Sequence, residues 1–216
     1  MKAARLRAPR QWEFVEVDQP EPRMGQMRIR LQQVALCGSD MPDYHGVAPE
    51  YPLLPGGSGH EGIGIVEACP SGTYEVGETV LLWGFDRDNG LFQESVLTHD
   101  AGLLRMPAEE PVEKVLMSQL LGTVIRPFRK ISQIINQHVV VIGQGPTGQL
   151  FDSTLRNLGA RSIVAVDPLD YRLEVGRRSG ATHTLNPDRD DIVEAVREIT
   201  GGDMADIVVE AVGDAD

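Results

Sequence analysis

The feature that most constrains the fold is a glycine-rich turn between an apolar run and a helical segment. Residues 139–142 are consecutive valine or isoleucine side chains, which is typical of a buried parallel strand. A helical pattern follows from about Thr147 to Leu158. The turn between them reads Gly143-Gln144-Gly145-Pro146-Thr147-Gly148.

Each glycine of this turn has a separate steric role. Gly143 permits the tight turn, Gly145 lets the backbone approach a pyrophosphate, and Gly148 lets the helix pack closely on the strand. The first helical turn, around Pro146 and Thr147, presents unpaired N–H groups and its positive dipole end to phosphates. The sequence therefore predicts a dinucleotide site here.

An acidic residue is expected at the end of the next strand, about 20 residues farther on. Asp167 lies 19 residues after Gly148 and follows the apolar run 163–166. Its carboxylate can accept hydrogen bonds from ribose hydroxyls and would repel a 2′-phosphate, so NAD is favoured over NADP. Arg172 weakens this preference, because it could meet a phosphate. The alternative is a plain strand–helix turn with Asp167 as a helix cap.

The two halves of the chain follow different patterns. In residues 1–106, short alternating runs are separated by Gly and Pro, as in 27–31, 63–67, 79–82 and 91–98, which predicts a compact antiparallel barrel. Beyond about Pro111, a helix over 115–130 is interrupted by Pro127. Short runs at 163–166, 183–185 and 207–209 then alternate with helices, which indicates a parallel sheet.

One of these helices has Ile192, Val193, Val196 and Ile199 on a single face, with Asp190 as its cap. We expect a catalytic domain over residues 1–112 and a dinucleotide-binding domain over residues 113–216.

Composition excludes several classes of function. A net charge of −12 argues against nucleic acid as a partner, since phosphate binding requires clustered Lys and Arg. No apolar run is long enough to span a bilayer, so no membrane association is expected. The two cysteines, Cys37 and Cys69, do not form a disulfide framework, which favours a reducing, cytoplasmic location.

A second constellation lies in the first half of the chain. Cys37-Gly-Ser-Asp40 and Gly59-His60-Glu61 place a thiol, an imidazole and carboxylates within 25 residues. Zinc prefers sulfur and nitrogen donors, and a catalytic zinc keeps one coordination position open. Taken singly, Cys37 could be a buried small apolar residue, and His60-Glu61 could be a solvated turn. Together they predict a metal site.

These motifs resemble the zinc-dependent medium-chain alcohol and polyol dehydrogenases over the whole chain. The segments at the N-terminus, at 55–64, at 76–80 and at 206–213 match as well. The resemblance implies a GroES-like antiparallel β-barrel followed by a Rossmann domain. It also implies hydride transfer between NAD and a zinc-bound secondary alcohol or ketone.

The resemblance assigns roles to individual residues. Cys37 and His60 would bind zinc, and Asp40 would orient the imidazole. The usual third-ligand position falls at Ser118 or Gln119, and neither is a strong zinc ligand. The polyol branch, which includes sorbitol and threonine dehydrogenases, therefore resembles the chain better. In that branch Glu61 completes the ligand set, and Gln119 can bond the zinc-bound water.

Ser39 occupies the position of the hydroxyl that relays the substrate proton. The family histidine beyond it is replaced by Pro42, so His45, Tyr44 or water would continue the relay. Tyr44, Trp83 and Phe85 are candidate pocket walls. No cysteine occupies residues 81–90, so a single catalytic zinc is expected and no structural zinc.

The chain also departs from the family at its end. A complete doubly wound domain has about six strands, whereas about four are expected here. We expect an incomplete version of a longer, homo-oligomeric enzyme acting on a polyol, sugar alcohol or amino alcohol. The alternatives are a zinc-free NAD(P)H quinone or enoyl reductase of the same fold, and a truncated nucleotide-binding module without catalysis.

Overall fold

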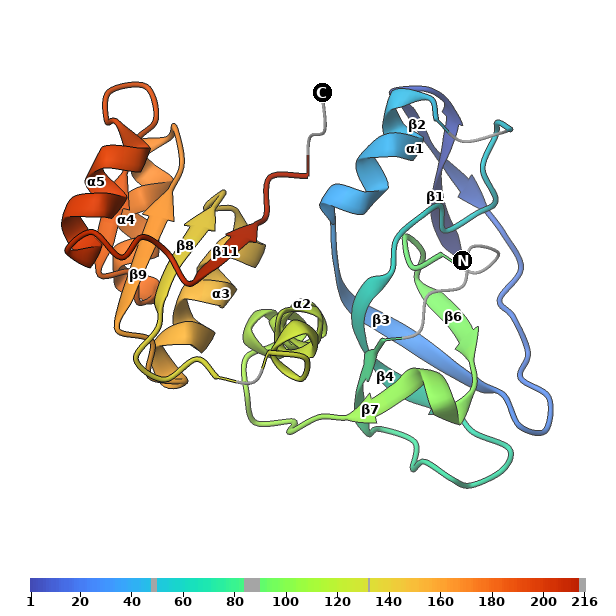
Figure 1. Ribbon diagram of the computed structural model, residues 1–216. Coiled ribbons are helices and arrows are strands. Elements are labelled where there is room, and N and C mark those ends of the chain that lie inside the picture. Colours follow the sequence, from blue (N-terminus) through green and yellow to red (C-terminus); the bar gives the residue numbers. More distant parts are fainter. Residues whose placement is uncertain (48–49, 84–89, 132, 214–216) are drawn as a thin grey trace. The chain divides into compact units, whose positions relative to one another are not determined.

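The computed structural model describes residues 1–47, 50–83, 90–131 and 133–213. The chain divides into two compact units, Met1–Leu120 and Leu121–Asp216 (Figure 1). The division falls inside helix α2 (Val112–Phe128), eight residues after the boundary expected between residues 112 and 113. In the described segments, no helix has the length and apolar character needed to cross a membrane.

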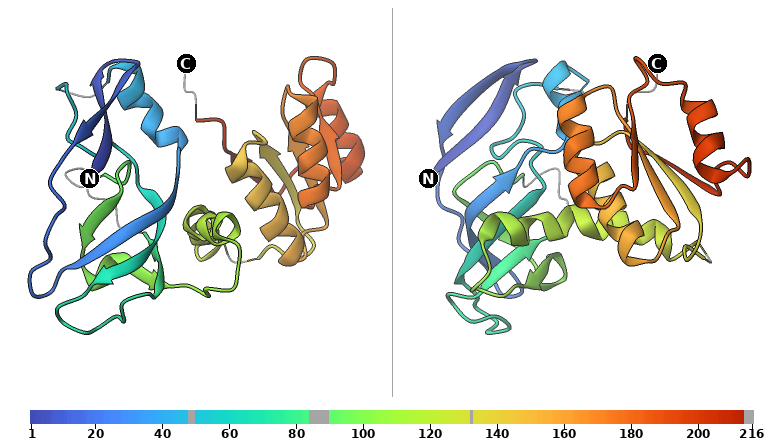
Figure 2. Two further views of the ribbon diagram at one scale, coloured as in Figure 1. Left: turned by 180° about the vertical axis from the view of Figure 1, so that it is seen from behind. Right: turned by 90° about the vertical axis from the view of Figure 1, so that its left-hand side faces the viewer.

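The first unit is built from antiparallel strands, which can be followed in Figures 1 and 2. Its strands are β1 (Lys2–Ala8), β2 (Gln11–Glu16), β3 (Met27–Ala35), β4 (Glu61–Ala68), β5 (Thr79–Leu82), β6 (Ser95–Thr98) and β7 (Leu103–Arg105). Among the described residues, the sheet order is β6-β3-β4-β5-β7, and β1 and β2 form a separate hairpin. Its short helices are the 3-10 turns η1 (Gly38–Asp40) and η2 (Asp100–Gly102) and the helix α1 (Met41–His45).

The run expected as one strand over 91–98 is shorter in the structure. Only Ser95–Thr98 pairs as a strand, while Phe92 and Gln93 make isolated bridges to Gly56 and Ala3. Residues 92 and 93 are thereby joined to the β1–β2 hairpin and to the segment that leads into β4. The alternation of apolar and polar residues in β3 places one side of the strand in the core. Met27 and Ile29 on that side are fully buried, and β3 pairs with β4 and β6.

The second unit alternates strands and helices. Its elements after α2 are β8 (His138–Ile142), α3 (Pro146–Asn157), β9 (Ser162–Val166), α4 (Asp170–Ser179), β10 (His183–Leu185), α5 (Ile192–Thr200) and β11 (Ile207–Glu210). Within residues 133–213, the parallel strands have the order β10-β9-β8-β11. This is the order of the first strands of a doubly wound dinucleotide-binding fold.

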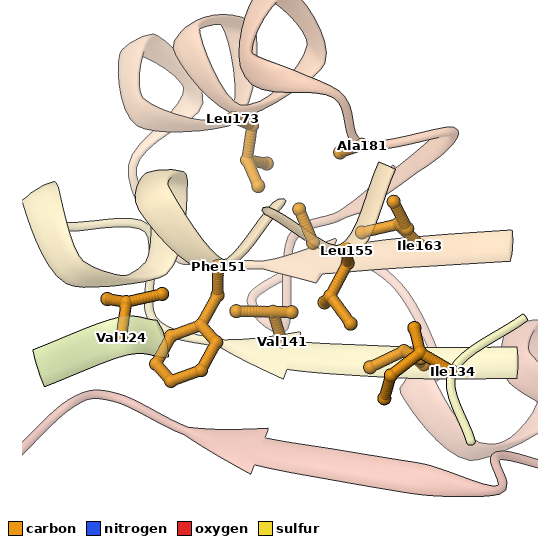
Figure 3. Close-up of a cluster of buried hydrophobic side chains, with 10 residues drawn as sticks. Val124, Ile134, Val141, Phe151, Leu155, Ile163, Leu173 and Ala181 are labelled. Carbon is orange, nitrogen blue, oxygen red and sulfur yellow. The ribbon is translucent and has the colours of Figure 1, made fainter. Parts of the chain in front are cut away.

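The two faces of the parallel sheet bury different side chains. Val141 and Ile163 face Phe151 and Leu155 of α3 and Leu173 of α4 (Figure 3). On the opposite face, Val140, Val164 and Val166 pack with Val196 of α5. The β8 and β9 strands are therefore apolar on both faces, which is why they read as continuous runs rather than alternating ones.

Two details of α5 differ from the sequence expectation. Asp191, not Asp190, caps the helix, since its side chain accepts a hydrogen bond from the Glu194 N–H at 3.1 Å. Asp190 instead accepts from the Asn186 N–H at 2.7 Å. Val193 is 58% exposed and does not belong to the buried face. The apolar stripe is thus narrower than the sequence suggested.

Candidate active site

The antiparallel pairing of β3 and β4 brings the cysteine and histidine motifs together. Ala35, at the end of β3, pairs with Glu61, at the start of β4. Cys37 lies two residues beyond that pair and His60 one residue before it. One ligand atom each from Cys37, His60 and Glu61 lies within 4.8 Å of the other two. Glu61 is 6% exposed, while the other two are partly buried.

The imidazole of His60 is held on one side by two oxygen atoms. Its Nδ1 lies 3.3 Å from the Asp40 carboxylate and 3.3 Å from the Ser58 carbonyl. Asp40, only 4% exposed, raises the pKa of His60 to about 9. The other ring nitrogen, Nε2, lies 3.3 Å from the Ser39 hydroxyl. The two ring nitrogens therefore have different surroundings, with Nδ1 beside the Asp40 and Ser58 oxygens and Nε2 beside Ser39.

Asp40 also shapes the turn that carries the cysteine. Its Oδ2 accepts a hydrogen bond from the Cys37 N–H at 2.8 Å, and its own N–H donates to the Cys37 carbonyl at 3.0 Å. The same carboxylate thus fixes the Cys37 backbone and the His60 ring. Hydrogen-bonded partners of this kind orient metal ligands.

The donor set fits zinc. Thiolate, imidazole and carboxylate are the three donor types that zinc accepts, and three protein ligands leave a fourth position for water or substrate. The Asp40 carboxylate beside the imidazole matches the histidine support usual at such sites. Ser58, which helps to hold the ring, was not identified from the sequence, because a backbone carbonyl leaves no signature in the residue types.

The expected proton relay is only partly assembled. Ser39 is exposed and lies beside His60. His45, at the end of α1, instead contacts the Arg10 guanidinium at 3.3 Å and the Tyr44 ring at 5.3 Å between centroids. Gln119 lies partly buried on α2 and makes no hydrogen bond to the cluster in the described part of the chain.

Two of the three residues expected to line the substrate pocket, Trp83 and Phe85, are not placed in a pocket by the structure. Trp83 is 54% exposed, and Phe85 lies outside the described residues.

In the second unit, the glycine-rich turn has the geometry that its residues suggested. Gly143 has φ of 92°, a left-handed conformation that favours glycine. A Cβ added to Gly148 would lie 1.9 Å from the Gly143 carbonyl oxygen. Gly145 precedes α3 in an extended conformation, and Pro146 begins the helix, followed by Thr147. The N-terminus of α3 therefore opens directly from the turn.

Asp167 is tied to this turn by its carboxylate. Its Oδ2 accepts from the Gln144 N–H at 2.8 Å, and its Oδ1 accepts from the Leu169 N–H at 2.9 Å. Arg172 lies 3.5 Å from Oδ2. The residue is 3% exposed. The spacing in the sequence predicted that Asp167 lies close to the glycines. It did not predict the hydrogen bond from the Gln144 N–H that links the carboxylate to the turn.

The chain is similar to known proteins in both of its units. The family model of the alcohol dehydrogenase GroES-like domain matches residues 23–108, and the zinc-binding dehydrogenase model matches residues 146–216. L-threonine 3-dehydrogenase of Pyrococcus horikoshii is 28% identical over 93% of this chain and 66% of its own length. An alcohol dehydrogenase of Cupriavidus necator is 28% identical over 99% of this chain and 70% of its own.

A solved structure shows the same arrangement of elements. Alcohol dehydrogenase TADH from Thermus sp. ATN1 superposes with a TM-score of 0.85 at 26% identity, covering 100% of this chain and 71% of that chain. The chain thus spans about two thirds of the length of the Pyrococcus relative. Both family models and these relatives agree with the resemblance seen in the motifs. The chain belongs to the zinc-dependent medium-chain dehydrogenases.

Proposed function

We propose that Cys37, His60 and Glu61 bind one zinc ion, and that the protein transfers a hydride between NAD and a secondary alcohol or ketone. The observation that carries this proposal is the convergence of the three ligand atoms within 4.8 Å of one another. The substrate class is a polyol, sugar alcohol or amino alcohol. The name of the Pyrococcus relative, L-threonine 3-dehydrogenase, supports the amino alcohol.

The residues of the chain have distinct tasks in this reaction. When bound, zinc would supply Lewis-acid polarisation of the substrate oxygen, and NAD would be the acceptor of the hydride. Ser39 would accept the hydroxyl proton of the substrate at its Oγ, which lies 3.3 Å from the His60 ring, and would pass its own hydroxyl proton on to His45, Tyr44 or water. Asp40 keeps the ring and the Cys37 backbone in place throughout. Gln119 and His45 are assigned supporting roles, in bonding the zinc-bound water and in onward proton transfer.

The coenzyme preference rests on the surroundings of Asp167. Both carboxylate oxygens already accept backbone N–H groups, yet each can accept a further bond from a ribose hydroxyl. The negative charge disfavours a 2′-phosphate. Arg172 moderates but does not cancel that charge, since it lies 3.5 Å away and is 40% exposed. NAD is therefore preferred to NADP.

A single zinc is proposed because the sequence has only one other cysteine. Cys69 contacts the Ser71 hydroxyl at 3.3 Å within a turn. Assembly into a homo-oligomer completes the proposal, and light scattering of the purified protein tests it.

Metal content tests the zinc site directly. Purified protein should contain about one zinc per chain by mass spectrometry of the metal. Cys37→Ser and Glu61→Gln should each lose most of it, because each removes one of the three proposed protein ligands. Cys69→Ser is the matched control and should retain the wild-type content. Zinc-free wild-type protein, or full zinc in Cys37→Ser, would overturn the assignment.

Turnover separates the dehydrogenase from the alternatives. The assay uses NAD and NADP with polyols, sugar alcohols and L-threonine, at matched zinc content. Reduction of NAD by at least one alcohol supports the proposal. Bound zinc and NAD without turnover would favour a nucleotide-binding module, and reduction of a quinone by NADPH without zinc would favour the reductase alternative.

A further inference from the structure

A buried polar pair lies beneath the glycine-rich turn and has no part in the proposed reaction. Gln144 belongs to the turn and Asp152 to α3, and both are 0% exposed. Their side-chain oxygen and nitrogen atoms make no hydrogen bond to any described residue. Buried polar groups are normally paired, so an unpaired carboxyl and amide facing the same space require an explanation.

Glycines enclose the pair between α3 and α4. A Cβ added to Gly176 of α4 would lie 2.5 Å from the Gln144 Oε1 and 3.3 Å from the Asp152 Oδ2. One added to Gly148 would lie 3.5 Å from the Gln144 Nε2. The amide thus lies between the first turn of α3 and α4, next to the carboxyl.

The backbone of Gln144 connects the pair to the nucleotide site. Its N–H donates to the Asp167 carboxylate at 2.8 Å, and its carbonyl accepts from the Gln149 amide at 2.9 Å. The residue therefore joins the turn, the ribose-binding carboxylate and the start of α3. A change in its side chain is transmitted to all three.

The charge of Asp152 is set by its surroundings. Burial raises the pKa of its carboxyl to about 7, and the nearby Gln144 amide partly offsets that rise without the geometry of a hydrogen bond. No charged group among the described residues contributes to this pKa.

Charged groups on the adjoining elements have other contacts. Asp167 pairs with Arg172, and Glu174 pairs with Arg177. Arg156 packs against Gly180. Burial and the amide are therefore what govern the protonation of Asp152.

We propose that Asp152 is a positioning residue that makes coenzyme binding depend on pH. In its protonated form the carboxyl is uncharged, so the space beneath the turn carries no charge that opposes the pyrophosphate. In its ionised form a buried negative charge lies beneath the turn, and binding of the anionic coenzyme weakens. The inference rests on the proposed nucleotide function of this turn.

The test is calorimetric titration of the protein with NAD at pH 6 and pH 8. If only the protonated form binds, the apparent Kd of the wild type rises roughly tenfold between these pH values. Asp152→Asn keeps a buried donor without a titrating charge, so its Kd should change by less than about twofold. Asp203→Asn, at an exposed position in the same unit, is the control and should behave as the wild type.

A second variant covers the case in which Asp152→Asn does not fold. Gln144→Met removes the amide that lowers the pKa of Asp152, so the loss of affinity should move to higher pH. A wild-type Kd that is equal at both pH values, or an unchanged pH dependence in Asp152→Asn, would overturn this inference alone. Absence of NAD binding at either pH would overturn the proposed nucleotide function together with it.

Discussion

At the residue scale, the glycines of the turn after β8 differ in what they tolerate. A Cβ at Gly145 would meet no atom within 4 Å, and its φ of −69° suits any residue. A Cβ at Gly148 would collide with the Gly143 carbonyl oxygen at 1.9 Å. The fold therefore requires glycine at position 148. At position 145 the fold would accept a side chain, and only the proposed coenzyme requires glycine there.

Gly148→Ala should destabilise the second unit by about 1–3 kcal/mol, because backbone must move to relieve the contact. Gly145→Ala should unfold as the wild type does but bind NAD more weakly, since its methyl group would occupy the space proposed for the pyrophosphate. Urea unfolding and NAD titration of both variants distinguish the effects. Equal stability of the two variants would contradict the steric argument at Gly148.

At the element scale, the N-cap of α5 is Asp191, one residue after the Asp190 that the sequence analysis expected. Asp190 and Asp191 are equally good caps by residue type. Only Asp191 has its carboxylate against the Glu194 N–H, because Asp190 is engaged by the Asn186 N–H. The Asn186 turn thus decides where the helix begins.

Asp191→Ala should lower the free energy of unfolding by about 1 kcal/mol, the usual value of a lost N-cap. Asp188→Ala removes a carboxylate from the same loop without removing a cap, and should change stability by less than about 0.5 kcal/mol. Circular dichroism of urea unfolding measures both. An equal loss in the two variants would mean that the charge, and not the cap, is responsible.

At the scale of the whole molecule, the buried Asp152 couples folding to pH. Its pKa is about 7 in the folded protein and near 3.8 when unperturbed. Between these values the folded protein holds a proton that the unfolded chain has released. Stability is therefore highest at low pH within this window and falls as pH rises through it.

The loss amounts to at most about 4 kcal/mol, since each unit of pKa difference corresponds to about 1.4 kcal/mol. Asp152→Asn should remove this component, so that its stability relative to the wild type increases from pH 5 to pH 8. Denaturant unfolding of both proteins at the two pH values measures the difference. A constant difference between them would show that Asp152 does not titrate in the folded state.

The sequence by itself determined the order of strands and helices in the second half and the position of the glycine-rich turn. Those features depend on neighbours along the chain: apolar runs, glycines at fixed spacing, and an acid after the next strand. The short strand His183–Leu185 was identified for the same reason. The two motifs of the proposed zinc site were also visible in the sequence, as residue types.

Tertiary structure decided which side chains meet. The β3–β4 register brings Cys37 beside His60 and Glu61, and helix packing buries Asp152 with Gln144. It also turned His45 toward Arg10, which residue type alone did not indicate. Such contacts join residues far apart in the chain, and their energies depend on burial and geometry that no local pattern encodes.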